Sequence, residues 1–268
     1  MTIVDRDQAV AALDEAFDAF VALAEGLAPD DWDRSTACPG WSVKDTVSHV
    51  IGIESMLLGR PTPAVTLPDD LPHVRNDFGR VNEQWVESYR GRPPAEVVAD
   101  LRDVVARRRT AVAGMDQAAF DEDSFTPAGP DTYGRFMRVR VMDVWFHDQD
   151  IREAIGRPGH LEGLAPAAAL DEVAMAIGYV VGKKAAAPPG SSVRFELTGP
   201  MARRIDVDVG ERARVVDRLT GEPTTTLTVP GDRFTRLVGG RGADPGVVAI
   251  TGDAGLGQAV VANLAYMI

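Results

Sequence analysis

Apolar side chains recur at steps of three and four residues through most of the first 160 positions, the spacing of helices that bury one face. The pattern predicts helices over about residues 5–26, 43–57, 74–90, 94–114 and 131–155. Ser42 stands three residues before Asp45, the arrangement of an N-cap with an acidic first turn. We interpret residues 116–130 as a loop, and the short connections between the helices predict a bundle over residues 1–160.

The pattern changes after residue 160. One more helix is predicted over about residues 166–186, and others over about 231–239 and 253–266. Between them apolar and polar residues alternate with period two, which predicts half-buried strands and an antiparallel sheet. The alternating apolar positions are Val193, Phe195, Leu197, Ile205, Val207, Val209, Thr225, Leu227 and Val229. Residues 161–268 are therefore predicted to form a small α+β domain.

Composition narrows the classes of protein that the chain fits. Its 268 residues are 45% hydrophobic and 25% charged, the balance of a soluble globular protein. No run approaches the roughly 18–20 apolar residues of a membrane span, and no signal peptide is visible, so we expect a cytoplasmic protein. The net charge of −12 disfavours nucleic-acid binding. The single cysteine, Cys38, fits a reducing compartment.

The predicted helix over residues 131–155 carries a polar constellation. Asp143, His147 and Asp150 are spaced i, i+4 and i+7 and share one helix face, beside apolar neighbours. His49 stands in the middle of the predicted second helix, also among apolar residues. Two helices of a bundle could bring His49, Asp143 and His147 together as two nitrogens and one oxygen, a ligand set that leaves a divalent metal one open position.

Simpler interpretations of the same residues remain open from spacing alone. An Asp–His pair at i, i+4 is often a helix salt bridge, and an inward histidine is often a satisfied core residue. The two other histidines, His73 and His160, stand in turn-rich segments, and we interpret both as surface residues.

Three motifs resemble those of one known family. CPGWSVKD at residues 38–45, followed by SHV at 48–50, resembles the N-terminal signature of the mycothiol-dependent maleylpyruvate isomerase family, which belongs to the DinB-like metalloproteins. RVRVMDVWFH at 138–147 and GRGAD at 240–244 continue the resemblance in order along the chain. The arginine-rich composition is compatible with an actinobacterial source, where mycothiol is abundant.

The resemblance implies a DinB-like four-helix bundle that binds zinc, followed by a C-terminal domain resembling sterol-carrier folds. It places the metal ligands on His49, Asp143 and His147, although family members usually have glutamate where Asp143 stands. It implies that Arg241 is a catalytic and substrate-binding arginine and that Asp150 orients His147 or transfers protons. It also implies that Arg75 binds substrate.

Plainer roles compete for the two arginines, because Arg241 could be a turn residue paired with Asp244 and Arg75 a solvated loop residue.

The chemistry implied is a thiolate, stabilised by zinc, that attacks a small electrophile. A mycothiol-dependent transferase leaves the thiol on the product, whereas the alternative, maleylpyruvate isomerisation, removes the thiol again. A second alternative is a non-catalytic ligand-binding or regulatory module with a structural metal, and a nucleophilic Cys38 is a further one. The electrophile, the identity of the metal and the oligomeric state are left open by the sequence.

Overall fold

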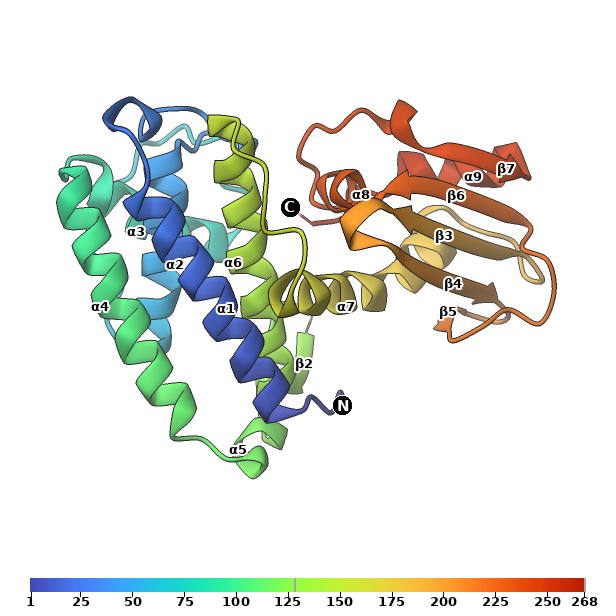
Figure 1. The fold of residues 1–268 in the computed structure, drawn as a ribbon, viewed down its shortest axis with the longest axis horizontal. Helices are drawn as coiled ribbons and strands as arrows, with labels where there is room; N and C mark the ends of the chain where they lie inside the picture. The colour runs from blue at the N-terminus through green and yellow to red at the C-terminus, as the bar shows by residue number, and fades with distance from the viewer. Residues whose placement is uncertain (128, 268) are drawn as a thin grey trace. The chain divides into compact units, whose positions relative to one another are not determined.

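The computed structural model describes residues 1–127 and 129–267. The chain forms two compact units, Met1–His160 and Leu161–Ile268 (Figure 1).

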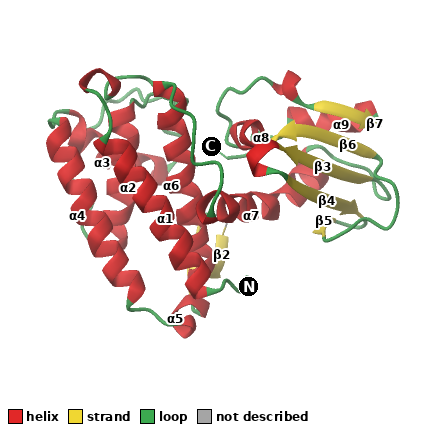
Figure 2. Ribbon diagram, viewed as in Figure 1, coloured by secondary structure: helices red, strands yellow, loops and turns green. Residues whose placement is uncertain are grey.

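The N-terminal unit is built mainly from helices (Figure 2). Its main helices are α1 (Arg6–Glu25), α2 (Val43–Leu57), α3 (Asp77–Arg90), α4 (Pro94–Ala113) and α6 (Tyr133–Ile155). Helix α1 packs against α4 and α6, and α2 packs against α3, α4 and α6. Phe17, Val50 and Trp145 are fully buried in the core between these helices. The helices predicted from the three- and four-residue periodicity are confirmed, with α3 beginning three residues later than expected.

Local sequence fixes where these helices begin and end. Ser42 and Asp45 form a reciprocal capping box, in which each side chain accepts a hydrogen bond from the other residue's backbone N–H. Thr132 caps α6 by accepting from the backbone N–H of Arg135. Helix α6 ends where Gly156 adopts a left-handed conformation with φ of 66°, which glycine reaches without steric cost. These caps place His49 and His147 well inside their helices.

The expectation of a loop over residues 116–130 was wrong. A short helix, α5 (Gln117–Asp121), is followed by an antiparallel hairpin of β1 (Asp123–Thr126) and β2 (Gly129–Thr132). The N-terminal segment reinforces this hairpin, since the backbone N–H and hydroxyl of Thr2 both donate to the Asp131 carboxylate. Elements of four or five residues are too short to show a periodic pattern of apolar residues. Whether they form depends on long-range contacts.

The C-terminal unit contains a five-stranded sheet with strand order β5-β4-β3-β6-β7. The strands are β3 (Ser192–Thr198), β4 (Arg203–Val209), β5 (Ala213–Val216), β6 (Thr225–Pro230) and β7 (Ala249–Gly252). The helices are α7 (Leu164–Tyr179), α8 (Gly231–Val238) and α9 (Ala254–Ala262). The mixed arrangement of helices and sheet is the α+β class predicted for residues 161–268.

The sheet differs from the prediction in direction and extent. Strands β3 and β6 are parallel, so the antiparallel expectation was wrong at the centre of the sheet. Alternation reports which face of a strand is buried and carries no information on the direction of its neighbour. The edge strands β5 and β7 were not predicted, because they are short and largely exposed and show little apolar alternation.

Among the described residues, one helical stretch, Leu164–Lys184, is long and apolar enough to cross a membrane by length and composition. The sequence analysis expected no such stretch. Of its most apolar 18-residue segment, 61% is buried inside the structure, as in the core helix of a folded domain.

Candidate metal centre

Two neighbouring helices bring His49, Asp143 and His147 together. His49 lies on α2, and Asp143 and His147 lie one turn apart on α6. The Nε2 atom of His49 is 3.4 Å from Asp143 Oδ2, and Nε2 of His147 is 3.7 Å from Asp143 Oδ1. One donor atom from each of the three residues lies within 4.8 Å of the others, so a single ion could contact all three.

The chemistry of these donors fits a divalent metal. His49 is 5% exposed, and among the described residues its ring nitrogens make no well-aligned hydrogen bond, since Nδ1 has no partner and Nε2 has only the 3.4 Å contact with Asp143. A buried polar group without a partner is costly, and a cation on Nε2 would satisfy this nitrogen. Two imidazoles and one carboxylate are a ligand set that zinc accepts while keeping a further position open. The residues present therefore fit the group that the sequence led us to expect.

The electrostatics are those of three closely coupled groups around one carboxylate. Burial would raise the pKa of Asp143, but the charges of Arg140, His147 and His49 outweigh it and hold that pKa well below its usual range. Burial would lower the pKa of His147, but the charge of Asp143 and a hydrogen bond to Asp150 raise it to about 10. For His49 burial prevails and lowers the pKa.

A second layer of polar atoms contacts His147 from its other ring nitrogen. Asp150 is fully buried, and its Oδ2 lies 3.0 Å from His147 Nδ1. The same oxygen accepts a hydrogen bond of 3.1 Å from the Cys38 thiol, which is 3.9 Å from His147 Nδ1. A carboxylate on Nδ1 keeps the Nε2 lone pair of a histidine available for a metal.

Cys38, His147 and Asp150 are themselves a second group whose donor atoms could hold an ion. Cys38 was expected only as an alternative nucleophile, and no histidine stands near it in the chain. Cys38 and His147 are 109 residues apart in the chain, and only the folded structure brings them together. In the sequence, only the CPGW turn and the helix cap that follows it indicated that Cys38 lies close to the bundle.

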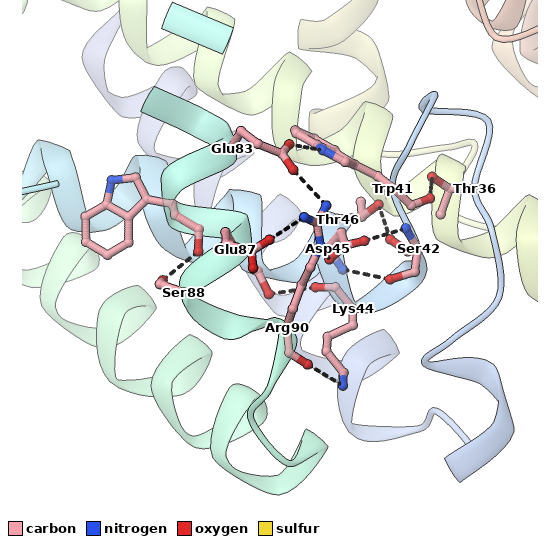
Figure 3. Close-up of polar contacts among 12 residues, drawn as sticks. Thr36, Trp41, Ser42, Lys44, Asp45, Thr46, Glu83, Glu87, Ser88 and Arg90 are labelled. Atoms are coloured by element: carbon pink, nitrogen blue, oxygen red, sulfur yellow. Dashed lines mark hydrogen bonds and ion pairs between the residues drawn. The ribbon is translucent and has the colours of Figure 1, made fainter. Parts of the chain in front are cut away.

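Trp41, in the same turn, lies against the centre. Its ring centroid is 4.9 Å from that of His49 and 6.1 Å from that of His147. The indole N–H donates to Glu83, a fully buried carboxylate on α3 that also forms an ion pair with Arg90 (Figure 3). Burial would raise the pKa of Glu83, but its hydrogen bonds with Trp41 and His73 and the nearby Arg90 lower it. This buried anchor fixes the tryptophan beside the two histidines.

The interpretation of His73 and His160 as surface residues was wrong. Their side chains are only 14% and 9% exposed. Nε2 of His73 lies 3.0 Å from Glu83, and Nδ1 of His160 lies 3.2 Å from Asp148, which is fully buried. Each histidine meets a buried carboxylate on the adjacent helix, 10 residues away for His73 and 12 residues away for His160. The turn-rich character of its own segment did not predict this contact.

The two predicted arginines lie on loops. Arg75 is exposed in the loop between α2 and α3, next to Asn76, which caps α3. Arg241 is half-buried in the turn after α8 in the C-terminal unit, where its Nη1 donates to the carbonyl of Gly239. The Asp244 carboxylate accepts from the backbone N–H of Gly246. The roles expected for both arginines stay predictions.

The fold and the site together define a helical unit with a candidate metal centre, joined to an α+β unit, and comparison with known proteins identifies its family. The chain matches the family described as Mycothiol maleylpyruvate isomerase N-terminal domain over residues 13–152, more than half of its length. It therefore belongs to this family. The match spans α2 and most of α6, the helices that carry the three candidate ligands.

Solved structures and other sequences extend the comparison. A crystal structure of a mycothiol-dependent maleylpyruvate isomerase superposes with a TM-score of 0.59 and 16% identity, covering 94% of this chain and 96% of that one. A histidine-to-alanine mutant of such an isomerase has a TM-score of 0.57 at 14% identity, with the same coverage. Two uncharacterized proteins from strains of Mycobacterium tuberculosis are 25% identical over 202 residues, covering 74% of this chain and 76% of theirs.

Proposed function

We propose that the protein is a metal-dependent, mycothiol-dependent transferase or isomerase that acts on a small electrophile. The observation that carries the proposal is the His49, Asp143 and His147 donor set, in which both histidines are buried and, among the described residues, the only polar contact of the His49 ring is the 3.4 Å approach of Nε2 to Asp143. Membership of the mycothiol maleylpyruvate isomerase family and the fold shared with an isomerase of that name support the choice of thiol.

In this proposal His49, Asp143 and His147 hold the metal, with zinc the preferred ion because two imidazoles and a carboxylate suit it. A bound divalent cation lowers the pKa of a coordinated thiol and so supplies a thiolate at neutral pH. Asp150 accepts from His147 Nδ1 and keeps the opposite nitrogen directed at the centre. Trp41 covers the ring of His49 and limits the entry of water.

The reaction begins with addition of the thiolate sulfur to an electrophilic carbon. With a conjugated cis-diacid, a carbon–sulfur bond forms while the double-bond electrons move onto the neighbouring carbonyl group. Rotation about the resulting single bond and cleavage of the carbon–sulfur bond give the trans isomer and return the thiol. With a substrate that carries a leaving group, that group departs with the electron pair and the carbon–sulfur bond remains, which is a transfer.

Arg241 and Arg75 are proposed to bind a carboxylate of the substrate, for which the planar guanidinium group is suited. Asp150, fully buried beside His147, is the proposed group for proton transfer. Substitution of Arg241 by alanine is then expected to lower turnover and leave metal content unchanged. Equal turnover would remove Arg241 from the site.

The finer architecture belongs to the same proposal. Helices α1, α2, α4 and α6 are proposed to be a DinB-like four-helix metal-binding domain over residues 1–160. Residues 161–268 are proposed to be a domain resembling sterol-carrier folds. The partners expected are the low-molecular-weight thiol and a small electrophile, in the cytoplasm. We expect no nucleic-acid or membrane partner, and the negative net charge argues against nucleic acid.

The first experiment measures metal content in tag-free protein. We expect about one zinc per chain in the wild type, loss of zinc in His49→Ala and Asp143→Ala, and full content in the control His160→Ala. His160 is the matched control because it is also a largely buried, carboxylate-bound histidine, paired with Asp148 outside the donor set. A wild type that folds without metal would refute the thiolate mechanism.

The second experiment separates the enzymatic alternatives from a binding module. Mycothiol added to the cobalt-substituted protein is expected to change the visible absorption of the metal, because the thiol sulfur becomes a ligand. An unchanged spectrum would favour a structural metal in a non-catalytic module. Incubation with mycothiol and maleylpyruvate then distinguishes catalytic isomerisation, which consumes no thiol, from stoichiometric formation of a thiol conjugate.

A further inference from the structure

A row of charged side chains crosses the N-terminal unit through three buried residues, Arg108, Glu54 and Arg140, and ends at Asp143, whose side chain is 29% exposed. Arg108 comes from α4, Glu54 from α2, and Arg140 and Asp143 from α6. Glu54 is fully buried, Arg108 is 1% exposed and Arg140 is 4% exposed. Charges so far from solvent persist only when they are paired and hydrogen-bonded, so their mutual geometry is strongly determined.

Glu54 fixes the orientation of Arg140. Its Oε2 accepts from Arg108 Nε at 2.7 Å, and its Oε1 accepts from Arg140 Nε at 2.9 Å and Nη2 at 2.8 Å. Two donors of the Arg140 fork are therefore committed to Glu54. Its remaining nitrogen, Nη1, donates to Asp143 Oδ2 at 2.8 Å.

Charge balance explains why this last contact forms. Glu54 alone would leave the two guanidinium groups with a net charge of one in the interior, and Asp143 neutralises it. The charge-assisted hydrogen bond from Arg140 Nη1 then holds Asp143 at its Oδ2 atom. The pair is more than a surface i,i+3 contact, because its arginine is 4% exposed and is held by Glu54 from a second helix, α2.

We infer that Arg140 is a positioning residue for Asp143, which it holds through Oδ2 so that Oδ1 is available to a metal. The inference rests on the proposed function, since it assigns Asp143 to a metal centre. Oδ1 lies on the side of His147, 3.7 Å from its Nε2. Asp143 would thus be a ligand through one oxygen, with its orientation set by Glu54 and Arg108 at the far end of the row.

The experiment compares Arg140→Lys and Arg140→Met with the wild type, using Zn²⁺ and Co²⁺ as probes. Each purified protein is first checked for cooperative unfolding, then titrated with each ion against a chromophoric chelator, and the visible spectrum of the cobalt form is recorded. Arg152→Met is the matched control, because Arg152 pairs with fully buried Asp148 at 2.7 Å on the same helix without contacting Asp143.

We expect Arg140→Met to bind both ions about 10- to 100-fold more weakly than the wild type, the usual cost of removing a group that orients a metal ligand. Arg140→Lys keeps the charge but lacks the planar fork, so it should recover part of the affinity and show a shifted cobalt spectrum. Arg152→Met should match the wild type in both affinity and spectrum.

Wild-type affinity and an unchanged cobalt spectrum in Arg140→Lys and Arg140→Met would overturn the inference while leaving the proposed metal centre intact. If Arg140→Met does not fold, the lysine variant decides alone through its spectrum and affinity. A wild type that binds neither ion would instead refute the proposed function on which the inference rests.

Discussion

The contact between Asp150 and His147 gives the sharpest test of how the candidate centre is organised. Asp150→Asn is nearly isosteric but replaces a carboxylate by an amide. The carboxylate Oδ2 lies 3.0 Å from His147 Nδ1 and also accepts from the Cys38 thiol at 3.1 Å. The amide is a weaker acceptor and can turn a donor toward Nδ1, which favours the tautomer that carries its proton on Nε2 and blocks metal binding.

The magnitude follows from the single contact involved. Loss of a group that hydrogen-bonds a metal-binding histidine typically costs 10- to 100-fold in affinity, or about 1.4–2.7 kcal/mol. We expect a loss in this range for Asp150→Asn, measured as the zinc dissociation constant in competition with a chromophoric chelator at constant pH and ionic strength.

Asp148→Asn is the control for this measurement. Asp148 is on the same helix, is equally buried and also contacts a histidine, His160, but this histidine is outside the donor set. The control should lose stability and keep its zinc affinity. Equal zinc affinity in wild type and Asp150→Asn, or an equal loss in both variants, would refute the reasoning.

Three further predictions concern stability. Burial would raise the pKa of Asp131, but its hydrogen bonds with Thr2, Arg135 and Thr132 lower it. Asp131→Asn should therefore lower the free energy of unfolding in urea by about 2 kcal/mol at pH 7. This loss of stability relative to the wild type should shrink as the pH falls below about 4, where the carboxylate becomes protonated in the unfolded chain. A cost that is the same at pH 3 and pH 7 would contradict this. A Cβ on Gly52 would approach Trp85 Cβ to 2.6 Å, so Gly52→Ala should destabilise the protein by about 1–3 kcal/mol; an unchanged Tm would show that the helices separate freely. Glu54→Gln leaves two buried guanidinium groups without their shared anion and should cost about 3–5 kcal/mol in denaturant unfolding, whereas a cost below about 1 kcal/mol would show that these charges are solvated in the fold.

The positions of the main helices could be predicted from the sequence because helix formation is a local property. Apolar spacing, the Ser42 cap and the glycine after α6 each act over a few residues, and they fix the rotation of His49 and His147 into the interior. The i, i+4 relation of Asp143 and His147 follows from helical geometry alone. The resemblance to the family added the expectation that His49 joins them.

Local sequence is therefore sufficient to predict the main helices, the strands β3, β4 and β6, and the face that each of them buries. The tertiary structure alone decided the contacts between elements: the parallel pairing of β3 with β6, the burial of His73 and His160, and the approach of Cys38 to Asp150. The strand pairing and the Cys38 contact join residues far apart in the chain, whereas His73 and His160 reach carboxylates 10 and 12 residues away because the chain folds back onto the adjacent helix. Buried charges pair by proximity in the folded core, where each must be neutralised. Local sequence carries no record of which distant carboxylate will meet a given histidine or arginine.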